Sequence, residues 1–249
     1  MDITSYIIHL ERAVDRKDNV EQLAKQLPGR VVVVDAVDGN ELDDASISSI
    51  YRQRTHKPSY PFDLRRSEIA CFMSYRKAWQ ALIDSEDDYC LIVEDDIVFE
   101  EQQFVIALKL ALESASRNSY IRFPIKNREA VGTLLGSSGQ VKHYSPDRIG
   151  LGMVMQIVGR DAAKRLLAAS KVIDRPVDTL IQLNWITSVS PTVVFPNGVS
   201  EISHQLGGST IGSKMAISEK IYRELLRPIY RFSLNIIRAR AIKNEKTSQ

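Results

Sequence analysis

The first half of the chain alternates between apolar, strand-like runs and amphipathic, helix-like runs. Apolar runs predict strands over residues 4–10, 30–34 and 89–93, and the four consecutive valines of the second run predict a strand buried on both faces. Helical periodicity predicts helices over residues 11–27 and 67–83, the second with Ser67 as its N-cap. This order predicts an α/β fold with a mixed, mainly parallel sheet covered by helices.

The second half continues this alternation as far as residue 178. The pattern predicts a helix over 101–115, short strands near 120–123 and 152–158, a helix over 160–169, and a further helix opened by Pro176. Residues 197–213 are rich in Gly and Ser and too long for a simple connection, so we expect a loop that covers a substrate. We expect one domain over residues 1–213 and a separate tail over 214–249.

The tail forms a basic amphipathic helical segment. Its helical pattern, over residues 215–242, places two sets of residues on opposite faces. The basic face carries Lys220, Arg223, Arg227, Arg231 and Arg238, and the apolar face carries Ile221, Leu225, Ile229, Phe232 and Ile236. Pro228 is expected to kink or divide this helix. Two interpretations remain open: adsorption to the anionic inner membrane, or packing of the apolar face on the protein's own body with the basic face in water.

Composition narrows the class of protein. With 249 residues, 44% hydrophobic and 26% charged, the chain is neither fibrous nor disordered. The 33 basic and 31 acidic residues nearly balance, and the basic excess lies in the tail, so nucleic acid is not an expected partner. The N-terminus lacks the pattern of a signal peptide, and we expect a cytoplasmic protein. Cys71 and Cys90 are too few for a disulfide framework and are expected to be reduced.

The main candidate for a metal or ligand site is a run of three acidic residues, Glu94-Asp95-Asp96, at the end of the most apolar predicted strand. Side chains alternate along an extended chain, so Glu94 and Asp96 point one way and Asp95 the other. Ligands of open α/β sheets bind at the carboxyl ends of strands, and carboxylates there suit Mg²⁺ or Mn²⁺. His204 is a candidate third ligand. The alternative is a solvated turn after a strand.

Two families place acids after such a strand. Residues 91–96 resemble the first strand of bacterial receiver domains, which is the basis of an alternative: a non-catalytic, Mg²⁺-binding α/β signalling module. A receiver would carry a phospho-accepting Asp about 45 residues later. Residues 125–143 contain no Asp, so this resemblance fails on spacing.

A second resemblance covers most of the chain, in five segments between residues 6 and 178. Residues 6–16 (Y-I-I-H-L-E-R, then D-R) are similar to the opening I-N-L-x-R-x-x-D-R of glycosyltransferase family 25, the lipooligosaccharide galactosyltransferase family. Residues 36–39 resemble its A-V-D-G, residues 67–79 its G-E-I-G-C-x-x-S-H-x-x-x-W, residues 91–96 its L-I-L-E-D-D, and residues 176–178 its P-V-D. His9, Ala70 and Tyr75 depart from the family's Asn, Gly and His.

The resemblance implies a GT-A-like nucleotide-sugar-binding fold. It also implies an inverting, metal-dependent galactosyltransferase that uses UDP-galactose and a lipid-linked acceptor of the lipopolysaccharide or lipooligosaccharide core. The same fold with another UDP-hexose, such as UDP-glucose, is the alternative. The family's motifs imply donor contacts at His9, Leu10, Val37, Asp38, Gly39 and Asp95.

The reaction itself favours the same residue types. A departing diphosphate gains negative charge, which guanidinium groups at Arg12, Arg16 or Arg76 and a metal at Glu94 and Asp96 would meet. Inversion needs a base beside the acceptor hydroxyl. Asp178 is the first candidate and Glu201 the second.

Overall fold

The computed structural model describes residues 3–126, 129, 132–206 and 217–247. Its centre is an eight-stranded sheet with the order β2-β1-β3-β8-β5-β9-β7-β6. Strands β8 and β7 run opposite to the other six, which all point the same way. The sheet is therefore mixed and mainly parallel, as the sequence predicts. Its strands are β1 (Thr4–His9), β2 (Val31–Asp35), β3 (Tyr89–Glu94), β5 (Tyr120–Arg122), β6 (Thr133–Ser138), β7 (Val141–Ser145), β8 (Met155–Gly159) and β9 (Thr192–Phe195).

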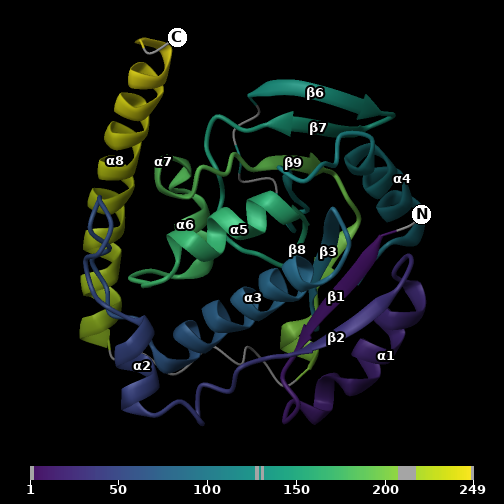
Figure 1. Ribbon diagram of the computed structural model, residues 1–249, viewed down its shortest axis with the longest axis horizontal. Helices are drawn as coiled ribbons and strands as arrows, with labels where there is room; N and C mark the ends of the chain where they lie inside the picture. The colour runs from purple at the N-terminus through teal and green to yellow at the C-terminus, as the bar shows by residue number, and fades with distance from the viewer. Residues whose placement is uncertain (1–2, 127–128, 130–131, 207–216, 248–249) are drawn as a thin grey trace.

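Helices cover both faces of the sheet (Figure 1). The alternation of β1 separates the two cores: Tyr6 and Ile8 face the helices α3, α5 and α6, whereas Ile7 faces α1 and α4. A second, two-stranded sheet pairs β4 (Ile97–Phe99) with β10 (Val199–Glu201). The helices are α1 (Lys17–Gln26), α2 (Asp44–Ile50), α3 (Arg66–Asp84), α4 (Glu101–Leu112), α5 (Arg160–Ala169), α6 (Val177–Ile181), α7 (Asn184–Thr187) and α8 (Ile217–Thr247), with single 3-10 turns at Val14–Arg16 and Ser203–Gln205.

Some predictions about local structure are wrong. Strand β2 is not buried on both faces: Val33 is 50% exposed, because β2 is the edge strand of the sheet. The first helix does not start at Glu11 but at Lys17, after a 3-10 turn. The helix predicted from Ser67 begins one residue earlier, and its N-cap is Arg65 rather than Ser67. Glu68 Oε2 accepts a hydrogen bond of 2.8 Å from the Arg65 backbone N–H.

The segment predicted as a covering loop is partly ordered structure. Residues 199–201 form β10 and residues 203–205 a 3-10 turn, while residues 207–213 lie outside the described part of the chain. The predicted boundary at residue 213 falls there too. Both cysteines are free, and Cys90 is fully buried.

Helix α8 stands at the side of the molecule away from β1 and β2, and its C-terminal end extends past the body (Figure 1). Pro228 does not divide it, since one helix runs through that residue. Tyr230, 9% exposed, and Leu234 pack against the core. Within the described residues, no helix combines the length and apolarity needed to cross a bilayer.

Candidate active site

A cleft of about 1610 Å³ opens at the carboxyl ends of β1, β2 and β3. The strand ends and the turn after β2 form one side, α3 contributes a continuous face, and the segment before β8 together with the start of α6 closes another side. Helix α8 completes the boundary. In open α/β sheets this is the edge at which ligands bind.

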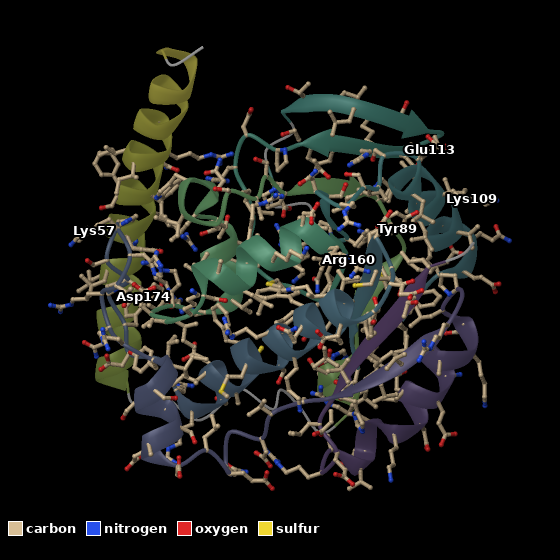
Figure 2. All side chains as sticks on the ribbon, in the orientation of Figure 1. Lys57, Tyr89, Lys109, Glu113, Arg160 and Asp174 are labelled. Atoms are coloured by element: carbon tan, nitrogen blue, oxygen red, sulfur yellow. The ribbon has the colours of Figure 1, made fainter. Side chains whose placement is uncertain are left out.

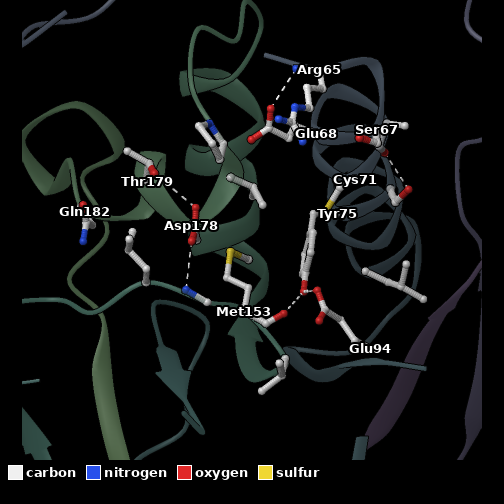
Figure 3. A pocket seen from close by; sticks show the side chains of 18 of the residues that line it. Arg65, Ser67, Glu68, Cys71, Tyr75, Glu94, Met153, Asp178, Thr179 and Gln182 are labelled. Carbon is white, nitrogen blue, oxygen red and sulfur yellow. Dashed lines mark hydrogen bonds between the residues drawn. The ribbon is translucent and has the colours of Figure 1, made fainter. Parts of the chain in front are cut away.

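At the end of β3, Glu94 and the α3 residue Tyr75 form a coupled pair (Figure 3). The Tyr75 hydroxyl lies 2.8 Å from Glu94 Oε1 and also hydrogen-bonds the carbonyl oxygen of Met153. A phenol has one proton, so it serves both oxygens at once only when Glu94 is itself protonated and donates. Burial and the negative charge of Asp96 raise the pKa of Glu94 to about 8, which agrees with a protonated carboxyl.

The next residue, Asp95, makes buried contacts with two other side chains of the protein. Its two oxygens contact His9 Nδ1 at 2.7 Å and Arg16 Nη1 at 2.5 Å, and all three side chains are buried. Arg16 also lies 3.1 Å from Asp96 Oδ2. Burial alone would lower the pKa of Arg16, but Asp95 and Asp96 outweigh it and hold that pKa above its usual value. Arg16 thus joins the acidic turn to the start of α1.

The pairing of β4 with β10 brings a fourth acid to this corner. Glu201 stands opposite Ile97, and the Ile202 N–H donates to the Asp96 carbonyl at 2.8 Å. Burial raises the pKa of Asp96, and Glu201 is among the acids that add to the shift. Glu94, Asp96 and Glu201 therefore bring three carboxyl groups to one corner of the cleft, where Arg16 pairs with Asp96.

The carboxyl groups of this corner suit a divalent cation that keeps some of its coordination positions open for other ligands. Mg²⁺ and Mn²⁺ bind through one or two carboxylates together with water and phosphate oxygens. Among the described residues, no set of three or more His, Cys, Asp or Glu side chains is arranged to hold an ion by itself. Glu94 and Asp96 are the residues that would hold the cation, with the remaining ligands coming from a bound molecule.

Comparisons with known proteins agree with this architecture. Residues 2–135, more than half of the chain, match the profile of glycosyltransferase family 25 (LPS biosynthesis protein). The chain belongs to glycosyltransferase family 25. Procollagen galactosyltransferase 2 of Homo sapiens is 32% identical over 100 residues, which is 39% of this chain and 16% of that protein. A glycosyltransferase 25 family member of Drosophila pseudoobscura pseudoobscura is 26% identical over 185 residues, which is 72% of this chain and 28% of that protein. The chain thus spans less than a third of these relatives.

Solved structures show more remote likenesses. A galactosyltransferase in complex with donor and acceptor sugar analogues aligns with a TM-score of 0.38 and 12% identity, covering 80% of this chain and 86% of that one. A 4-diphosphocytidyl-2C-methyl-D-erythritol synthase aligns with a TM-score of 0.39 and 16% identity, covering 91% and 100%.

In this family 25 chain, the structure brings most of the predicted donor residues to the cleft. The cleft is lined by these candidate binding, metal and catalytic residues from the sequence analysis: Leu10, Arg12, Arg16, Val37, Gly39, Glu94, Asp95, Asp96, Asp178 and Glu201. Asp178 Oδ2 accepts the Gly152 N–H at 3.0 Å, so the start of α6 is tied to the segment before β8 (Figure 3). The placement of these residues agrees with a role in binding, and their individual roles stay predictions.

Two further predicted donor residues, His9 and Asp38, do not line the cleft. His9 follows the alternation of β1: Ile8 and Leu10 line the cleft, and His9 turns to the opposite side, where it supports Asp95. Asp38 does not line the cleft either. It pairs with Arg12 Nε and accepts the Asn40 N–H at 2.8 Å, and the Arg12 hydrogen bond lowers the pKa of Asp38. Asp38 therefore orients Arg12.

The predictions for Arg76 and His204 do not agree with the structure. Arg76 is bonded to the end of α5, through Nη1 to the Ser170 carbonyl at 2.6 Å. The cleft face of α3 repeats every three to four residues, and Arg76 lies about 100° away from Tyr75 around the helix. His204 is exposed, lies outside the cleft, and contacts Gln205 rather than the acidic corner.

Sequence reasoning missed two contributions to the cleft. Tyr75 appeared only as a departure from the family pattern, although helical spacing from Ser67 and Cys71 places it on the same face. The other is α8, which presents Arg227, Arg231 and Arg238 to the cleft and leaves its apolar stripe outside. The stripe is exposed at Leu225 (67%), Ile229 (61%), Phe232 (67%) and Ile236 (37%). Packing of this stripe on the body, one of the two interpretations, is therefore wrong for these residues.

Proposed function

We propose that this protein is a metal-dependent hexosyltransferase of the GT-A type that transfers galactose from UDP-galactose with inversion. The acidic corner of Glu94, Asp96 and Glu201 at the carboxyl ends of the parallel strands carries the proposal, because carboxyl groups gathered there suit a cation that binds a diphosphate. Family membership and relatives named as galactosyltransferases support the donor sugar. They also count against a signalling module.

The donor diphosphate would lie between the acidic corner and the arginines at the start of α1. Departure of UDP leaves negative charge on its diphosphate, and Arg12 lines the cleft with a guanidinium that Asp38 orients. Arg16 is held by Asp95 and Asp96, so it supplies fixed positive charge rather than a mobile contact. A bound Mn²⁺ or Mg²⁺ would act as a Lewis acid on the leaving group.

Inversion requires a base on the acceptor side, and Asp178 is our first choice. Its Oδ2 is held by the Gly152 N–H and its Oδ1 lies 3.2 Å from Thr179 Oγ1, so the carboxylate is fixed at the cleft wall. Glu201 is the second choice, since it lines the same cleft but lies beside the acidic corner. Asp178→Asn should lower kcat at least ~100-fold and leave UDP binding unchanged, whereas Glu201→Gln should weaken Mn²⁺ binding. The reverse pattern would exchange the two roles.

We also propose a bacterial lipopolysaccharide or lipooligosaccharide core as acceptor, and a cytoplasmic location at the inner face of the inner membrane. The exposed apolar stripe of α8 supports contact with a lipid surface. The test of the donor is a screen that measures UDP release from UDP-galactose, UDP-glucose and UDP-N-acetylglucosamine with Mn²⁺. We expect UDP-galactose to be turned over fastest, and faster release from UDP-glucose would favour the alternative donor.

A further inference from the structure

Helix α8 turns its basic face toward the cleft. The residues that line the cleft, Arg227, Tyr230, Arg231, Leu234, Asn235 and Arg238, repeat every three to four positions and form one face of the helix. The apolar stripe lies on the opposite face. An amphipathic helix normally buries its apolar face, so the observed orientation directs charge into the cleft at the expense of that burial.

Helix α8 is held in this orientation by a buried arginine. Arg175 is fully buried, donates from Nη1 to the Tyr230 hydroxyl at 2.8 Å, and is paired with Asp174 through Nε at 2.7 Å. Its Nη2 donates to the carbonyl oxygens of His56 and Pro58 and to Asp174 Oδ2. The helix therefore belongs to the cleft wall.

A further arginine from the body meets this face. Arg238 Nη2 donates to the Pro146 carbonyl at 3.3 Å, which brings the helix against the segment that carries Arg148. Arg148 also lines the cleft. We name Arg148, Arg227, Arg231 and Arg238 the arginine wall. Two nearby carboxylates offset part of its charge: Glu224 pairs with Arg227 at 3.0 Å, and Asp147 interacts with Arg238.

Two members of the wall are available to a ligand. The side chains of Arg148 and Arg231 are exposed and make neither a hydrogen bond nor an ion pair to any residue that the structure describes. Guanidinium groups match oxyanions in geometry and charge, and frequently bind phosphate or carboxylate through two parallel hydrogen bonds. The wall is thus suited to an anionic group that enters the cleft.

The position of the wall points to the acceptor rather than to the donor. The acidic corner and Arg12 lie at the strand ends, whereas α8 forms a different part of the cleft's boundary and stands at the edge of the molecule, apart from β1 and β2 (Figure 1). The start of α6 links α8 to the candidate base: Arg175, which holds Tyr230, precedes Asp178 by three residues. Burial raises the pKa of Tyr230 to about 12, and Asp178 is among the carboxylates close enough to add to that shift.

We infer that the arginine wall binds an oxyanion on the acceptor, so that the acceptor is an anionic saccharide bearing a phosphate or carboxylate group. This inference rests on the proposed transferase function and adds the chemical class of its second substrate. Arg148 and Arg231 would make the direct contacts, and Arg227 and Arg238 would supply the surrounding positive charge.

The test compares charged and neutral saccharides of the same size. The full chain, saturated with UDP and Mn²⁺, is titrated with methyl glucoside, methyl glucoside 6-phosphate and methyl glucuronide, and fluorescence of the cleft residue Trp185 reports binding. The protein, an Arg148→Gln/Arg231→Gln variant, and a matched Arg30→Gln variant are compared. Arg30 is exposed at the opposite end of β2, outside the cleft.

We expect at least one charged saccharide to bind roughly tenfold or more tightly than the neutral one, the gain of a charge-assisted hydrogen bond. The double variant should lose this preference and the Arg30 variant keep it. Binding of the phosphate alone or of the glucuronide alone would identify the oxyanion. Equal binding of all three saccharides, or an intact preference in the double variant, would overturn the inference.

Two controls separate this inference from the proposed function. If the double variant loses affinity for UDP while the preference among saccharides stays, the wall holds the donor and the inference is wrong, but the transferase function stands. If the unaltered protein binds no UDP with Mn²⁺, the proposed function fails, and the titrations in the absence of UDP still decide whether the wall binds oxyanions. Because Arg148 and Arg231 have no described partners, the variants should unfold at the same temperature as the parent.

Discussion

Replacement of Glu94 by Gln should remove a pH dependence of stability from the metal-free protein. In the folded state the pKa of Glu94 is about 8, against 4.5 for the free side chain, so the folded protein holds a proton that the unfolded chain releases. The contribution of this proton to stability is complete below pH 4.5, declines as the pH rises, and is exhausted above about pH 8. Each pH unit corresponds to about 1.4 kcal/mol, which gives about 5 kcal/mol as an upper bound over the whole window.

The assay is urea unfolding between about pH 5 and 8.5 in the presence of a chelator. The amide introduced by Glu94→Gln can donate a hydrogen bond to Tyr75 as the protonated acid does, so the variant should match the parent near pH 5 and exceed its free energy of unfolding increasingly toward pH 8. All other groups are the same in both proteins, so their contributions cancel in the difference, which reports Glu94 and its interaction with Asp96. Glu113→Gln, at the exposed end of α4 (Figure 2), is the matched control and should shift the curve uniformly. Parallel curves for the parent and Glu94→Gln would refute the reasoning.

Two further predictions separate structural from binding residues. Asp95→Ala removes the buried carboxylate that His9 and Arg16 share, and leaves Arg16 paired with Asp96. The free energy of unfolding should therefore fall by about 3 kcal/mol in urea denaturation, and a loss below about 0.5 kcal/mol would contradict the buried network. Exchange of Leu225 and Phe232 for Ser should reduce sedimentation with anionic vesicles by about tenfold or more and leave the unfolding temperature unchanged, because both side chains are exposed; unchanged sedimentation would argue against membrane contact through α8.

The alternation of apolar runs predicted β1, β2, β3, β5 and β8 and the helices between them in the right order, but α2, β4, β6, β7 and β9 were not predicted. Burial of β2 was not predictable in this way, because a valine run looks the same in a central strand and in an edge strand, and only the non-local order of the sheet decides. The same limit applies to the acidic corner. Glu201 reaches Asp96 through the antiparallel pairing of β4 with β10, which joins segments about 100 residues apart and leaves no local signal.

Other errors could have been avoided with the periodicities of the elements themselves. Alternation along β1 places His9 opposite Ile8 and Leu10, and helical spacing along α3 separates Arg76 from the face that carries Tyr75.

The orientation of helix α8 could not be predicted from its own periodicity. Its pattern defined the two faces correctly, but which face meets the body depends on the buried contact of Arg175 with Tyr230, and that contact joins distant parts of the chain.

The central claim is that the carboxylates at the end of β3 hold a cation that binds the diphosphate of a sugar nucleotide. Thermal unfolding with UDP, Mn²⁺ or both tests it most directly. We predict that the two ligands together raise the unfolding temperature by about 5 to 10 °C at saturating concentrations, more than the sum of their separate effects. Asp96→Asn should abolish this synergy, and Asp18→Asn, on the exposed face of α1, should retain it. Additive shifts in the parent protein, or full synergy in Asp96→Asn, would contradict the account.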